Sequence, residues 1–74
     1  MAAADKLHNA RSILSDYRSL GDKVWDRFTG SNKEEVLWYY RAVTEAFLKH
    51  GPSRLTEELA RTVEEIVRLT GAAR

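Results

Sequence analysis

The stretch that decides the fold is residues 29–52, TGSNKEEVLWYYRAVTEAFLKHGP. Apolar side chains recur in it at spacings of three and four residues, as they do along one face of an α-helix. These side chains are Val36, Leu37, Tyr40, Val43, Phe47 and Leu48. Ser31 followed by Glu34 has the pattern of a capping box, and Gly51-Pro52 ends the periodic run. We therefore predict a helix over about 32–49.

The same periodicity predicts a helix on each side of this one. The stripe of the first, over about 3–20, is Leu7, Ala10, Leu14 and Tyr17. The stripe of the last, over about 53–70 and opened by Pro52 or Ser53, is Leu55, Leu59, Val63, Ile66 and Leu69. Gly21 suits a left-handed position, after which Asp22 would cap a short connecting helix over about 23–28. No segment alternates with period two, so we predict an all-α fold: one domain, residues 1–74, built as a small bundle of three main helices and a short connecting one.

Length and composition bound the function. A chain of 74 residues forms one small and marginally stable domain. It has no cysteine, which excludes disulfides and thiolate metal sites. With 12 basic and 11 acidic residues the net charge is +1, too small to favour nucleic acid or an acidic membrane. No apolar run approaches the ~20 residues of a membrane span, so we expect a cytoplasmic protein.

Few residues in the chain have catalytic chemistry. There are two histidines and no glycine-rich phosphate loop. Asp5 and His8 share a helix face and could reach one metal ion, but a catalytic site wants three protein ligands. Such a pair is more often an acidic first-turn residue beside a surface histidine. The final helix carries Glu57, Glu58, Glu64 and Glu65, which argues against a DNA-binding helix-turn-helix.

The aromatic run Trp38-Tyr39-Tyr40-Arg41 has two interpretations. Aromatic rings interleaved with arginine resemble a platform on which nucleic-acid bases stack. Three consecutive aromatic residues on a helix point in three directions, however, so at least one faces the core and another is free to anchor an interface. We favour core and interface roles because the net charge is only +1.

The beginning of the chain resembles a known family. Ala4-Asp5-Lys6-Leu7-His8-Asn9 followed by Arg11 is similar to the last signature of the HD-domain metal-dependent phosphohydrolases, in the (p)ppGpp hydrolase branch related to RelA/SpoT. The segments that fit the helices following that signature are Asp16-Tyr17-Arg18, Leu20-Gly21-Asp22, residues 24–28 and residues 37–41. The similarity covers most of the chain and indicates the C-terminal part of an HD domain.

The resemblance also implies what the site lacks. Asp5 matches the final carboxylate ligand of the metal, usually Mn²⁺ in this branch, and Asn9 matches a residue that lines the nucleotide pocket. An HD site also needs an upstream histidine and a contiguous His-Asp pair, yet His8 is followed by Asn9 and His50 by Gly51. We therefore expect a truncated, non-enzymatic homologue that binds no cofactor, in which Asp5 and Asn9 are remnants.

Truncation predicts a surface for association. In an intact HD domain upstream helices cover the signature helix, so their loss would leave Leu7, Ala10 and Leu14 uncovered. We predict a homodimer whose interface draws on Leu7, Ala10, Leu14, Trp25, Trp38, Tyr39 and Tyr40. An alternative is a heteromeric interaction module, a regulator or antitoxin-like protein that folds on a partner. A third hypothesis is residual metal or nucleotide binding through Asp5 and Asn9 from two chains of a dimer.

Overall fold

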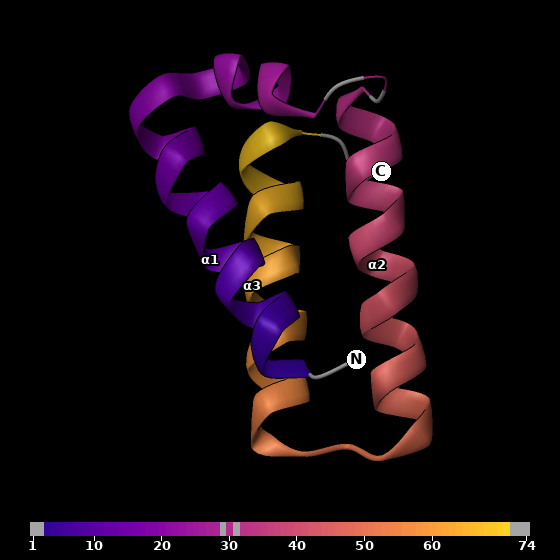
Figure 1. Ribbon diagram of the computed structural model, residues 1–74. Helices are drawn as coiled ribbons and strands as arrows, with labels where there is room; N and C mark the ends of the chain where they lie inside the picture. Colours follow the sequence, from indigo (N-terminus) through magenta and orange to yellow (C-terminus); the bar gives the residue numbers. More distant parts are fainter. Residues whose placement is uncertain (1–2, 29, 31, 72–74) are drawn as a thin grey trace.

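Four helical elements follow one another in the computed structural model, which describes residues 3–28, 30 and 32–71 (Figure 1). They are α1 (Ala3–Leu20), the 3₁₀ helix η1 (Gly21–Arg27), α2 (Lys33–His50) and α3 (Arg54–Thr70). No strand occurs in these residues, so the predicted small all-α bundle is confirmed. None of the helices in the described part of the chain has the length and apolar character needed to cross a membrane.

The start of α2 corrects one prediction. The N-cap is Asn32, whose side chain accepts a hydrogen bond from the Glu35 backbone N–H at 2.9 Å. The Glu35 carboxylate accepts one from the Asn32 N–H at 3.3 Å, which completes a capping box. The predicted box of Ser31 and Glu34 is therefore replaced by one a residue later, and Ser31 lies outside the described residues. Asparagine caps a helix as well as serine does, so the pattern alone did not separate the two starts.

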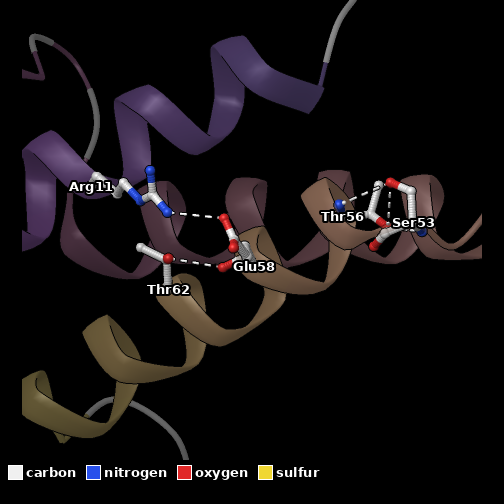
Figure 2. A network of polar contacts seen from close by, with 5 residues as sticks. All are labelled: Arg11, Ser53, Thr56, Glu58 and Thr62. Carbon is white, nitrogen blue, oxygen red and sulfur yellow. Dashed lines mark hydrogen bonds and ion pairs between the residues drawn. The ribbon is translucent and has the colours of Figure 1, made fainter.

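The start of α3 follows the same logic. Ser53 is the N-cap; its hydroxyl accepts from the Thr56 N–H at 3.3 Å, and the Thr56 hydroxyl accepts from the Ser53 N–H at 2.7 Å (Figure 2). Of the two residues predicted to open this helix, Ser53 forms the cap and Pro52 lies outside it.

The connection between α1 and α2 begins at Gly21, whose φ of 66° is the predicted left-handed conformation. The helix that follows is 3₁₀ and starts earlier than predicted, at Gly21. Asp22 does not cap it; its carboxylate accepts a hydrogen bond from the Trp25 indole N–H at 3.3 Å. The Trp25 ring lies between those of Tyr17 and Phe28, at centroid distances of 6.1 and 6.2 Å, and so fixes η1 against the end of α1.

The helix α3 is the centre of the bundle. It packs against both α1 and α2, and η1 crosses one end of the molecule (Figure 1). In Figure 1, α1 and α3 run in the same direction, and α2 runs antiparallel to both. One buried apolar cluster joins all four elements: Leu7, Ala10, Ile13, Val24, Trp25, Val36, Leu37, Tyr40, Leu59, Val63, Ile66 and Val67.

This packing overturns the expectation of an uncovered first helix. Leu7 is 3% and Ala10 0% exposed, and Leu14 packs half-buried against the core. The reason is that the apolar stripe of α3 is long enough to cover this face of α1 within the same chain. The first helix therefore needs no second chain to bury Leu7 and Ala10.

Two ion pairs repeat along the contact between α1 and α3. Arg11 binds Glu58 at 2.9 Å (Figure 2), and seven residues later in both helices Arg18 approaches Glu65 at 3.6 Å. A shared seven-residue step keeps the same faces together over about two turns, as in parallel coiled coils. Both pairs are solvated, so they contribute little to stability and act mainly by favouring this register of the two helices.

Leu59 tests the central position of α3, because its side chain is fully buried at the middle of the cluster. We expect Leu59→Ala to lower the free energy of unfolding by about 2–5 kcal/mol, the usual cost of a cavity in a core. Urea denaturation followed by circular dichroism measures this change. Leu69→Ala on the same helix is the matched control, since Leu69 is 40% exposed. Equal losses in the two variants would contradict the packing described.

Candidate interaction surface

The aromatic run on α2 divides between the core and the surface. Leu37 and Tyr40 are buried, whereas Trp38 is 71% and Tyr39 40% exposed. Successive residues of a helix differ by about 100° in direction, which is why the run splits in this way. Of the seven residues predicted to form an interface, Trp38 and Tyr39 are therefore at the surface. The others are covered by the chain itself: Leu7, Ala10, Trp25 and Tyr40 are buried and Leu14 is half-buried.

Trp38 stands at the rim of a groove between α2 and α3, which we call the Trp38 groove. Its volume is about 720 Å³. Its floor includes Leu37, Leu48, Val63 and Val67. Its rim consists of Glu34, Trp38, Arg41, Glu45 and Glu64. The groove thus combines an apolar floor, one exposed indole and charges of both signs.

The polar group in this floor has a partner of its own. The buried Thr44 hydroxyl donates to the Tyr40 carbonyl at 2.7 Å. A molecule that covers the groove consequently meets no unsatisfied hydroxyl there, so its apolar side chains can pack on the floor without the desolvation cost of an unpaired polar group.

The rim charges are available to a partner. Within the described part of the chain Arg41 forms no ion pair, and neither do Glu34 and Glu45. By contrast Glu65, on α3, is held by Arg68 and Arg18, and its hydrogen bond to Arg68 lowers its pKa. From the sequence, Glu34 was predicted to be a capping residue and Arg41 to belong to the aromatic run, but neither was assigned to the interface. The available signal was their helical spacing from Trp38, which places all three on one face.

A second polar cluster ties the start of α1 to α2. The Lys6 ammonium lies 5.2 Å from the centroid of the Tyr39 ring, which meets the Tyr40 ring edge-on at 5.5 Å. The pKa of Lys6 is raised, chiefly by its hydrogen bond with Tyr39. Burial raises the pKa of Tyr40, while Lys6 and a hydrogen bond with Asn9 act in the opposite direction. Tyr39 is thus engaged by its own chain, which leaves Trp38 as the more available aromatic residue.

The two residues to which the resemblance gave a site role, Asp5 and Asn9, lie near this cluster. Asp5 and Asn9 are both exposed, one helical turn apart on α1, and His8 is exposed beside them. Asn9 acts to lower the pKa of Tyr40, which burial raises, and Asp5 helps to raise the pKa of Lys6. In the part of the chain that the structure describes, no three side chains of His, Cys, Asp or Glu gather as a metal-binding group.

Comparison with protein families, with curated proteins and with solved structures gives no match for this chain. Its function is therefore inferred from its own residues.

Ionisation of Tyr40 should make the free energy of unfolding depend on pH in the alkaline range. Because its folded-state pKa is raised, the stability that its neutral form supplies is fully present below its ordinary pKa of about 10. It is lost as the pH rises through the higher folded-state value. We expect Tyr40→Phe to show a smaller fall in the free energy of unfolding above about pH 10, measured by urea titration at stepped pH. A Tyr40→Phe profile as steep as the parent's would contradict this assignment.

Proposed function

We propose that this chain is a non-catalytic helical protein that pairs with a second copy of itself through the Trp38 groove. The observation that carries the proposal is the 71% exposure of Trp38 at the rim of an apolar groove. Tryptophan is the side chain most enriched among residues that dominate binding energy, and it acts best when it is desolvated at the centre of an interface. A soluble chain that exposes such a residue beside apolar surface has a strong drive to cover it.

The extent of the groove supports a second copy. A standard interface covers about 800 Å² of each partner, which is roughly a sixth of this chain's 5109 Å² surface. The groove extends along α2 from Glu34 to Leu48, about 21 Å at 1.5 Å per residue. A helix of this chain's own length is therefore enough to fill it.

The closed core favours association of folded chains over folding on a partner. All four elements contribute to one buried cluster, and no buried side-chain nitrogen or oxygen in the described residues lacks a hydrogen bond. A chain of this kind can form its hydrophobic core without a partner. This supports self-association over the alternative of a heteromeric module that acquires its structure on binding.

The proposal includes an origin for the chain. We infer a relative of the C-terminal part of an HD-type (p)ppGpp hydrolase domain, on the basis of residues 4–9 with Arg11 and the aromatic run that follows. The non-catalytic assignment rests on residues 1–74, in which neither His8 nor His50 is followed directly by an aspartate. The cytoplasm is the proposed compartment. It is a reducing environment in which disulfides are rare, and this chain has no cysteine with which to form one.

Self-association is tested by light scattering coupled to size-exclusion chromatography at tens of micromolar. We expect a dimer for the parent chain and a monomer for Trp38→Ala, because the indole supplies the desolvated centre of the interface. Leu55→Ala is the control: Leu55 is 44% exposed but lies outside the groove, so this variant should remain dimeric. A folded parent monomer at this concentration would refute the proposal.

Metal binding provides a separate test of the non-catalytic assignment. Calorimetric titration with Mn²⁺ and a guanine nucleotide should give no binding heat, because one carboxylate such as Asp5 does not hold a divalent ion against water. Heat that disappears in Asp5→Ala would overturn this assignment and restore a ligand role for Asp5. Asp26→Ala, which removes an exposed carboxylate elsewhere, is the matched control.

A further inference from the structure

We propose, on the basis of the proposed self-association, that the two copies pair through antiparallel α2 helices, with Trp38 beside the two-fold axis and Arg41 facing the partner's Glu34. Three residues of the groove rim, Glu34, Trp38 and Arg41, and the geometry of α2 support this orientation and these charge pairs.

The first step is the position of these residues along α2. At 1.5 Å per residue, Arg41 lies about 4.5 Å beyond Trp38 toward the C-terminus and Glu34 about 6 Å before it. A two-fold axis at the level of Trp38, perpendicular to the helix, reverses the direction of the partner helix. The partner's Glu34 then lies within about 1.5 Å of the level of Arg41.

The second step is the direction of the same side chains around α2. At 100° per residue, Arg41 is turned about 60° from Trp38 and Glu34 about 40°, both to the same side. That side is the groove side, because the floor residue Leu37 is turned about 100° in the same sense. The two-fold operation keeps each side chain on its own side of the plane that contains the two helix axes. Arg41 and the partner's Glu34 therefore meet twice in the dimer, once on each half.

The third step is that charge disfavours three other arrangements. Parallel helices related by a two-fold axis place each rim residue at the level of its own copy, so Glu34, Arg41 and Glu45 would each approach a like charge and none would gain an opposite one. An antiparallel axis at the level of Arg41 stacks that arginine on the partner's Arg41. An axis midway between Trp38 and Arg41 sets Glu34 against the partner's Glu45. A fourth, an antiparallel axis at the level of Val43, would pair Arg41 with the partner's Glu45 but would place Trp38 about 7.5 Å from the axis. Among these arrangements, the axis at Trp38 is the one that joins opposite charges and also sets Trp38 beside the axis.

The unpaired state of the rim supports the same arrangement. Arg41 and Glu34 have no ion-pair partner within the described part of their own chain, so the dimer gives each a partner without breaking an existing pair. Glu35, the neighbouring carboxylate, is held in the capping box of α2 and is left out of the proposed contact.

The experiment is a charge reversal read by sedimentation equilibrium. We expect Arg41→Glu alone and Glu34→Arg alone each to raise the dimer dissociation constant about tenfold or more, because each creates two like-charge contacts per dimer. The double variant, Arg41→Glu with Glu34→Arg, should return to within about threefold of the parent. Circular dichroism of each variant confirms that the helices are intact.

Mixing the two single variants gives a sharper result. In a heterodimer of one Arg41→Glu chain and one Glu34→Arg chain, both contacts join opposite charges, so the mixture should dimerise about as tightly as the parent while each variant alone does not. Glu45→Arg is the control with the same change of charge on the same face, and its dissociation constant should stay within about twofold of the parent's. If the axis lay midway between Trp38 and Arg41, the dissociation constant of Glu45→Arg would instead fall, because the new arginine would face the partner's Glu34.

The outcomes separate this inference from the proposal beneath it. A parent dimer whose affinity none of the reversals changes, or a mixture that fails to pair, would overturn the orientation and leave self-association standing. A dimer tightened by Glu45→Arg would overturn the position of the axis in the same way. A parent chain that stays monomeric would overturn both.

Discussion

The structure depends on one constraint: the apolar stripe of α3 has to be covered on two sides by helices of the same short chain. Leu59 is fully buried, and Val63 and Ile66 are nearly so. A parallel α1 and an antiparallel α2 supply the cover (Figure 1). With α3 in the middle, the two outer helices need little contact with each other. The side of α2 that is turned away from α1 is left as the rim of the Trp38 groove.

Most of the fold could be predicted from the sequence, because local residue patterns determine where each helix begins and ends. Helical spacing gave the three long helices to within a residue or two, and Ser53 and Gly21 marked real boundaries. Two kinds of prediction were wrong. One concerned positions where neighbouring residues are almost equally good helix caps, and the other concerned contacts between segments that are far apart in the sequence. Asn32 took the cap assigned to Ser31, and the cover of Leu7 and Ala10 came from α3, which lies far along the chain. Patterning shows that a face is apolar, but not which helix of the chain covers it.

The same distinction explains the candidate site. Sequence analysis placed seven residues in an interface because it assigned the exposed face to α1, and most of those side chains belong to the core. Trp38 was included for a better reason: consecutive aromatic residues on a helix point in different directions, so they cannot all face the core. Glu34 and Arg41 were named in other roles and left out of the interface, because a charged residue on a solvated helix face carries no interface signal until the groove beside it is known. Their importance comes from their position relative to Trp38.

The central claim, that Trp38 is buried between two copies of the chain, is tested most directly by an isotope-filtered nuclear Overhauser experiment on a mixture of labelled and unlabelled chains. The account predicts intermolecular signals at the indole protons of Trp38 and none at Leu55, which lies outside the groove. An intact fold without any intermolecular signal at Trp38, at concentrations of hundreds of micromolar, would contradict it.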